Sequence, residues 1–217
     1  MKAQSTPRPA SALAALILVL TAATTHAAPE AQFQTAFGSF MQASEGDTGA
    51  VDKAADAFAA LLKAEPGNPV LLAYAGAATA MKAGTTLLPW KKMSYAEDGL
   101  AMLDKALAML APAHDAPLQN NTPGSLEVRF AAASTFLAVP GFMNRSVRGA
   151  KLLAEVQASP SFATAPLRFR ASVWMRAAKQ AATDQRLDDA RRLYGEVIRQ
   201  GAPQAPRAEA ALRGFGS

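Results

Sequence analysis

Apolar residues recur along most of this chain at the spacing of one face of an α-helix. The clearest example has two segments, with apolar positions at Trp174, Ala177, Ala178 and Ala181, and then at Ala190, Tyr194 and Val197. Residues three or four positions apart lie on the same face of a helix, so each segment predicts an amphipathic helix. Only a short polar break, 183–185, separates them. The two segments therefore predict a pair of antiparallel helices.

The same arrangement is predicted four times. The other pairs are expected over 30–44 and 50–64, from Val70 with a return helix over 94–110, and from Ser125 with a return helix over about 145–157. A short helix over 206–213 follows the fourth pair. Polar and apolar residues nowhere alternate over a useful length, so no strand is predicted. The pattern predicts an all-α fold of about four antiparallel helix pairs with a C-terminal capping helix.

Three segments interrupt the helical pattern and are expected to form inserted loops. They cover about 84–93, 112–124 and 138–144, and each contains Pro and Gly or clustered polar residues. The first and third are unusually apolar for loops. Two interpretations are open for them: an exposed anchor for a partner, or loops that fold back and fill the space between the helices.

Several positions in the first and fourth pairs match a known repeat. In the fourth pair they are Trp174, Ala178, Ala190, Tyr194 and, one position late, Pro203; in the first they are Ala54, Phe58, Leu61 and Pro66. At these positions the chain resembles a tetratricopeptide repeat (TPR). Other segments are similar to a group of exported bacterial TPR-like proteins with no assigned chemistry: 71–76, 92–93, 99–100, 103–106, 128–130 and 137–142. The resemblance implies a TPR-like α-solenoid in which Trp174 is a buried anchor.

The spacing of the repeats departs from the TPR pattern. The small residues expected to face inward on the four return helices are Ala54, Gly99, Gly149 and Ala190, which are 45, 50 and 41 positions apart. A regular TPR has a period of about 34 residues. We therefore expect a divergent repeat, with the extra length in the insertions.

The N-terminus has the features of a secretory signal peptide. Lys2 and Arg8 precede an apolar run over 12–23, and small residues lead to Ala27. We expect cleavage after Ala27, which would leave 28–217 as a single domain in the periplasm or outside the cell. An uncleaved signal that anchors the chain in the inner membrane is the alternative. The chain has no Cys, so disulfides do not stabilise it.

Charge divides the mature chain into two halves. Residues 28–124 carry six Lys and ten acidic residues, a net charge of −4, whereas 125–217 carry fourteen basic and seven acidic residues, a net charge of +7. The basic half presents a candidate surface for an anionic membrane or envelope polymer, at Arg168, Arg170, Arg176, Arg191, Arg192 and Arg199. The alternative is a solvated helix exterior that Asp188 and Asp189 partly neutralise. Aromatic residues do not interleave with these arginines, which argues against nucleic acid.

The residues needed for catalysis or for a metal site are scarce. The only histidines are His26, within the predicted signal, and His114, in a loop with only Asp115 beside it. Cys is absent, and His114 lies in a flexible, polar loop, so neither a Cys-His nor a Ser-His-Asp arrangement is indicated. We expect no enzymatic activity, no cofactor and no metal site.

A binding function is the remaining expectation, and two surfaces compete for it. The first is a groove along the first helices, expected at Val70, Ala73, Ala77, Ala80, Ser172, Met175, Lys179 and Ala182. The second is formed by the apolar inserted residues Leu87, Leu88, Trp90, Phe142 and Met143. We expect a non-enzymatic scaffold protein of the cell envelope that binds a protein or peptide. The alternative is a peripheral component of a membrane-associated transport or polymer-handling complex that docks through its Arg-rich half.

Overall fold

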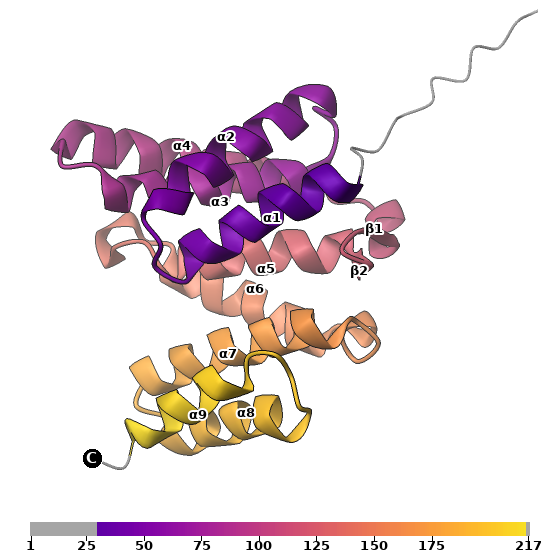
Figure 1. Ribbon diagram of the computed structural model, residues 1–217, viewed down its shortest axis with the longest axis vertical. Helices are drawn as coiled ribbons and strands as arrows, with labels where there is room; N and C mark the ends of the chain where they lie inside the picture. Colours follow the sequence, from indigo (N-terminus) through magenta and orange to yellow (C-terminus); the bar gives the residue numbers. More distant parts are fainter. Residues whose placement is uncertain (1–29, 216–217) are drawn as a thin grey trace, which may run out of the picture.

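The computed structural model describes residues 30–215, and this part of the chain is mostly helical (Figure 1). Its α-helices are α1 (Glu30–Ser44), α2 (Gly49–Ala64), α3 (Pro69–Thr85), α4 (Pro89–Ala108), α5 (Gly124–Phe136), α6 (Ser146–Ala158), α7 (Leu167–Thr183), α8 (Leu187–Arg199) and α9 (Ala205–Arg213). Short 3-10 helices lie at η1 (Pro112–Asp115), η2 (Gly141–Met143) and η3 (Pro160–Phe162), and strands at β1 (Pro117–Gln119) and β2 (Thr122–Pro123). The predicted signal over 1–27 lies outside the described residues.

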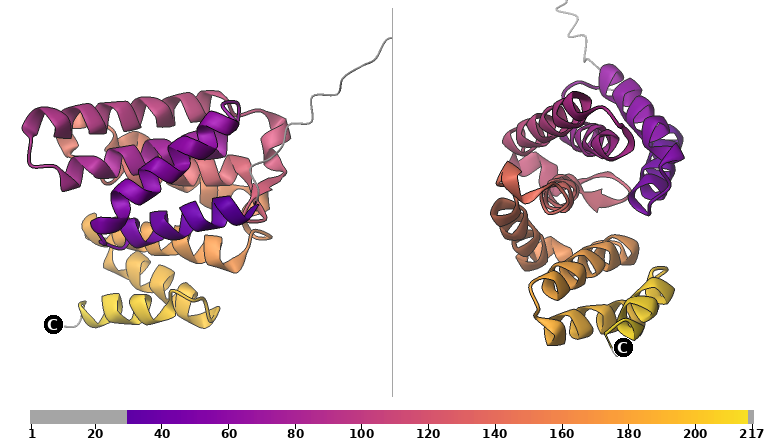
Figure 2. Two further views of the ribbon diagram at one scale, coloured as in Figure 1. Left: turned by 45° about the horizontal axis from the view of Figure 1, so that its top comes forward. Right: turned by 90° about the vertical axis from the view of Figure 1, so that its left-hand side faces the viewer.

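Each helix packs on the next one along the chain, so the predicted all-α class is confirmed. Four successive helix pairs are followed by α9, an order compatible with a helical repeat. The path is curved, and Figure 2 shows that α1 and α9, at the two ends of the described chain, lie on the same side of the molecule. No helix in the described part is long and apolar enough to cross a membrane.

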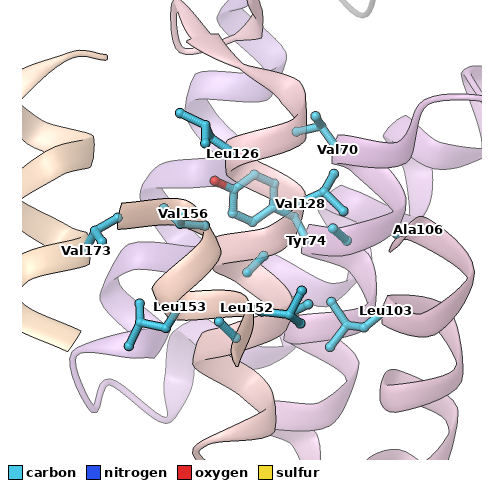
Figure 3. Close-up of a cluster of buried hydrophobic side chains, with 14 of the residues drawn as sticks. Val70, Tyr74, Leu103, Ala106, Leu126, Val128, Leu152, Leu153, Val156 and Val173 are labelled. Atoms are coloured by element: carbon cyan, nitrogen blue, oxygen red, sulfur yellow. The ribbon is translucent and has the colours of Figure 1, made fainter. Parts of the chain in front are cut away.

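One apolar core runs through successive helices. Figure 3 shows part of it, where Val70 and Tyr74 of α3 lie beside Leu126 and Val128 of α5, with Leu103 of α4 nearby. At the N-terminal end, Tyr74 also joins an aromatic cluster whose other members are Phe33, Phe37, Phe40 and Phe58. Their ring centroids lie 5.1 to 6.5 Å apart, a range typical of stabilising aromatic pairs. Burial of the apolar face of each helix thus holds the curved stack together.

Trp174 does not occupy the fully buried anchor position that the TPR resemblance implies. Its side chain is only half-buried, edge-on to Phe162 at a centroid distance of 5.9 Å. Small residues on the same helix, Ala171, Ala178 and Ala181, are the fully buried ones. The interior position of α7 is thus filled by alanines, which allow α8 to approach closely.

The insertion over 84–93 is mostly helical. Helix α3 extends to Thr85, and α4 begins at Pro89 rather than at the expected Ser94. Pro89 occupies the first turn of α4, where its missing N–H is not needed and its fixed φ suits the helix. The expected loop is thereby reduced to a short connection around Leu87.

The segment over 112–124 was expected to be irregular, and it contains a small hairpin instead. Strands β1 and β2 pair antiparallel around Asn120 and Asn121, whose φ values are +50° and +52°. Asn tolerates this left-handed conformation better than most residues, and two such residues form the tight turn of a hairpin. Strands of three and two residues are too short to produce a recognisable alternation in the sequence.

Candidate binding groove

A groove of about 1190 Å³ lies on the concave side of the curved stack. Its lining comes from α1, α3, α4, α5 and α7, with contributions from the hairpin, η2, α8 and the start of α9. These elements are far apart in sequence and meet because the helices follow a curved path (Figure 2). The groove is thus a direct product of the fold rather than of any single motif.

Helix α5 contributes a stripe of residues along the groove at the spacing of one helix face. In order they are Glu127, Phe130, Ala131, Ser134 and Thr135. Polar residues lie at two points of the stripe, and apolar residues separate them. A helix rises about 1.5 Å per residue, so Glu127 and Ser134 are about 10 Å apart along its axis.

The walls of the groove are largely apolar. Helix α1 contributes Phe37, Phe40 and Met41 on one side, and α7 contributes Phe169 and Met175 on the other. Phe169 meets Phe130 of α5 edge-on, with ring centroids 5.5 Å apart. Aromatic rings and methionines offer large, adaptable contact areas for an apolar ligand.

Glu127 is a buried acid on the α5 stripe, with only 1% of its surface exposed. The Tyr74 hydroxyl donates to its Oε1 at 3.3 Å, and Asn120 Nδ2 donates to the same oxygen at 3.0 Å. Burial raises the pKa of Glu127 to about 8, although both hydrogen bonds oppose that rise. Glu127 is therefore mostly uncharged at neutral pH. Its Oε2 has no hydrogen-bond partner among the described residues.

The position of Asn120 links this acid to α1. Asn120 Oδ1 accepts a hydrogen bond of 2.7 Å from Gln34 Nε2, while its amide nitrogen reaches Glu127. The left-handed turn of the hairpin holds the Asn120 side chain between the two helices. Burial also raises the pKa of Tyr74, and the neighbouring Glu127 adds to that rise.

Arg176 lies on α7 opposite Ser134 and also lines the groove. Its Nη2 donates to the Ser134 carbonyl oxygen at 2.9 Å, whereas its Nε and the Ser134 hydroxyl have no hydrogen-bond partners in the described part of the chain. No ion pair within 30–215 involves Arg176. Loss of solvation lowers the pKa of its guanidinium group.

Polar contacts connect α1 to the C-terminal helices across the groove. Arg207 of α9 pairs with Glu45, which follows α1. The guanidinium carbon of Arg168 lies 5.8 Å from the centre of the Phe37 ring, within range of a cation–π contact. Both contacts involve exposed or half-buried side chains, so they close one side of the groove only weakly.

The residues predicted from the sequence to line a groove divide into two groups. Ala77, Ala80, Ser172, Met175 and Lys179 lie on its surface as expected. Val70 and Ala73 are instead fully buried in the core, and Ala182 is half-buried away from the groove. The buried pair belongs to the face of α3 that packs against neighbouring helices, which the uniformly apolar sequence of α3 did not reveal.

The apolar residues predicted in the two insertions also fall into two groups, those that line the groove and those that do not. Phe142 and Met143 of η2 lie at the margin of the groove, but Leu87, Leu88 and Trp90 do not line it. Leu87 is 91% exposed and Trp90 is 68% exposed. Neither insertion therefore fills the groove, and the α3–α4 connection presents its apolar side chains to solvent.

The predicted basic surface is not one continuous face. Arg191, Arg192 and Arg199 form ion pairs with acidic residues of the same helix, Asp188, Asp189 and Glu196. Arg170 lies over the Trp174 ring at 5.4 Å. Arg168 and Arg176 differ, because they line the groove and make no ion pair with any described acid.

His114 takes part in local structure: its Nδ1 accepts a hydrogen bond of 2.9 Å from the Ala111 backbone nitrogen. Within 30–215, no group of three or more His, Asp or Glu side chains is placed to hold a metal ion. Comparisons with protein-family models, curated proteins and solved structures gave no match.

Glu127, Ser134 and Asn120 are among the polar residues of the groove that were not singled out from the sequence. Glu127 lies in the first turn of α5, where an acid ordinarily has only the role of favouring the helix dipole. The seven-residue spacing between Glu127 and Ser134 was the one available signal, because it places both on the same helix face. Nothing in the local sequence indicated that this face borders a groove.

Proposed function

We propose that this protein binds an extended segment of a partner protein in the groove and carries out no chemistry on it. One observation supports the proposal most directly. Four buried side-chain atoms have no hydrogen-bond partner in the described part of the chain, and all four belong to groove-lining residues: Glu127, Ser134, Arg176 and Gln204. Such atoms are costly to bury alone, so their concentration at one surface favours a polar ligand there.

The alternation of polar and apolar groups along the groove favours a peptide. An extended peptide carries backbone donors and acceptors at about 3.3 Å per residue and directs side chains to both sides. The apolar walls from Phe37 to Met175 would receive those side chains. The volume of about 1190 Å³ also exceeds the roughly 300–1,000 Å³ typical of small-molecule sites.

The fold proposed to support this function is a divergent, TPR-like solenoid. Helical-repeat proteins bind partners along extended concave surfaces, and the groove follows the concave side of the helix stack. The sequence features of the N-terminus support a role in the cell envelope after signal cleavage. Docking of the Arg-rich half on an anionic surface is less favoured, because the α8 arginines already have acidic partners.

A selection from a random library of displayed 12-residue peptides would test this function. The affinity of a recovered peptide is then measured by fluorescence anisotropy for the protein over 28–217 and for two tryptophan variants. Ser172→Trp places a large ring in the groove, whereas Asp188→Trp places one on the fully exposed Asp188 position of α8. We expect Ser172→Trp to weaken peptide binding by about tenfold or more, because the indole ring occupies space in the groove and displaces part of the peptide contact. Asp188→Trp should leave the affinity unchanged. Equal affinities for the two folded variants would contradict the proposal.

A further inference from the structure

We infer that Arg176 and Ser134 form a subsite for a carboxylate group of the bound peptide. The carboxylate would come from the C-terminus of the peptide or from an Asp or Glu side chain. This inference rests on the proposed function and specifies which chemical group of a peptide the groove recognises. It concerns the part of the groove where α5 and α7 face each other.

The charge of Arg176 has no acidic partner among the described residues. Among residues 30–215, only the Ser134 carbonyl accepts a hydrogen bond from its guanidinium group, at 2.9 Å, and Nε is left buried without a partner there. A partly buried cation normally has an acidic partner, because a buried charge costs free energy unless it is paired. Eight other arginines of the described chain do have acidic partners: Arg129, Arg145, Arg148, Arg186, Arg191, Arg192, Arg199 and Arg207. A ligand carboxylate would supply the missing partner.

The groove is lined by more basic than acidic residues. Its basic residues are Lys92, Arg168, Arg176, Lys179 and Arg207, and its one acidic residue is Glu127. Burial raises the pKa of that carboxyl to about 8, so it adds little negative charge at neutral pH. Arg207 is occupied by Glu45, but the other four basic residues have no acidic partner among the described residues. The groove therefore attracts a negatively charged ligand.

The hydrogen-bond donors around Arg176 suit the two oxygens of a carboxylate. A guanidinium group presents five N–H donors in a plane and suits the two oxygens of a carboxylate. The Ser134 hydroxyl is a further donor that has no partner in the described part of the chain, and Lys179 lies one turn beyond Arg176 on α7. Together these groups match one carboxylate better than a neutral amide, which offers a single acceptor oxygen.

The spacing of the polar groups fits a peptide that carries this carboxylate. Ser134 and Glu127 are about 10 Å apart along α5, which is the length of about three residues of extended chain. A carboxylate at Arg176 would therefore place a backbone group of the peptide beside Glu127 and Asn120. The side chains between them would lie against Phe130 and Ala131.

The test uses defined probes: dansyl-Leu-Phe-Leu-Phe with a free C-terminal carboxylate, the same peptide as its C-terminal amide, and dansyl-Leu-Asp-Leu-Phe amide. Binding is followed by dansyl fluorescence for the protein over 28–217, for Arg176→Gln and for the matched control Arg191→Gln. We expect at least one carboxylate probe to bind about tenfold more tightly than the uncharged amide, as charge-assisted hydrogen bonds suggest. This preference should be lost in Arg176→Gln and kept in Arg191→Gln. A preference for the free-acid peptide would identify a terminal carboxylate as the ligand group, and a preference for the Asp-containing amide would identify a side-chain carboxylate.

Two other results would contradict the account at different levels. In the first, all three peptides bind equally, Ser172→Trp weakens their binding and Arg176→Gln leaves it unchanged. This result would remove the carboxylate subsite and leave the proposed groove function intact. No binding of any probe by the folded protein, together with a failed selection from the displayed library, would overturn the proposed function itself. Arg176→Lys keeps the charge but not the planar donor group. A preference fully retained in this variant would assign the effect to charge alone and overturn the proposed donor geometry.

Discussion

Gly99 of α4 packs directly on the backbone of Gly76 in α3. A Cβ atom built on Gly99 would lie only 2.5 Å from the Gly76 carbonyl oxygen and 2.6 Å from the Ala80 nitrogen. Neither atom is the end of a flexible side chain, so the two helices would have to move apart. This contact explains why the fold keeps a residue of poor helical propensity in the middle of α4.

Gly99→Ala is expected to lower the free energy of unfolding by about 1–3 kcal/mol, because overpacking at this contact outweighs the better helical propensity of Ala. Gly195→Ala is the matched control, since an added Cβ at Gly195 in α8 would meet nothing within 4 Å. The control should stabilise the protein by roughly 0.5–1 kcal/mol. Urea unfolding of both variants measures the difference, and a stabilising Gly99→Ala would mean that α3 and α4 are not in such close contact.

The raised pKa of Glu127 makes stability depend on pH. The carboxyl has an ordinary pKa of 4.5 in the unfolded chain and a pKa of about 8 when buried, so unfolding releases a proton between these values. The contribution of this group to the free energy of unfolding should therefore be fully present below about pH 4.5, and should be lost as pH rises from there to about 8. The loss is on the order of 3–5 kcal/mol, at 1.36 kcal/mol per pH unit.

Glu127→Gln removes this titration while keeping an oxygen that can accept from Asn120 and Tyr74. Chemical unfolding at pH 5, 6.5, 8 and 9 should therefore give a flatter stability profile for the variant than for the parent protein. The variant should be relatively most stabilised at pH 9, where the parent carboxylate is ionised. Parallel profiles over this range would show that Glu127 is not buried as an uncharged acid.

The two tryptophans of the chain should differ in their contribution to stability. Trp174 is half-buried and contacts Phe162 and Arg170, whereas Trp90 is 68% exposed. We expect Trp174→Ala to cost about 2 kcal/mol, which is less than a fully buried tryptophan would, and Trp90→Ala to cost less than about 0.5 kcal/mol. Thermal unfolding compares the two. Equal effects would contradict the described packing of α7.

The ion pair between Glu45 and Arg207 should contribute little to stability but should respond to salt. Both side chains are about half exposed, so Arg207→Ala is expected to cost less than about 1 kcal/mol. Raising the ionic strength from 0.05 to 1 M should reduce the difference between parent and variant, since salt screens exposed charges. A larger, salt-independent loss would indicate that α9 and α1 are joined by more than this contact.

The helices were largely predictable from the sequence because each must bury one apolar face. Helix α1 covers 30–44 as predicted, and α9 begins one residue before its predicted start. The start of α4 was missed because Pro89 was interpreted as part of a loop rather than as the first residue of a helix. The hairpin around Asn120 was missed because its strands are too short to alternate visibly.

The groove was predictable only in part. Met175 and Lys179 were placed on it correctly from the helical spacing of α7. The pairing of Ser134 with Arg176 was not, because the two residues are 42 positions apart and lie on different helix pairs. Sequence periodicity identifies the face of a helix but not the helix that lies opposite it. The burial of Glu127 likewise depends on α3, α5 and the hairpin together.

The central claim, that a peptide binds in the groove, is tested most directly by photo-crosslinking. Methionine reacts readily with a benzophenone group, and this chain has methionines both in and outside the groove. Met41, Met81, Met93, Met143 and Met175 line it, whereas Met102 and Met109 do not. A peptide recovered from the displayed library, carrying benzoylphenylalanine, is irradiated in complex with the protein and the crosslinks are located by mass spectrometry. The account predicts crosslinks at Met175, Met41 or Met143. Crosslinks confined to Met102, Met109 or helix α8 would contradict it.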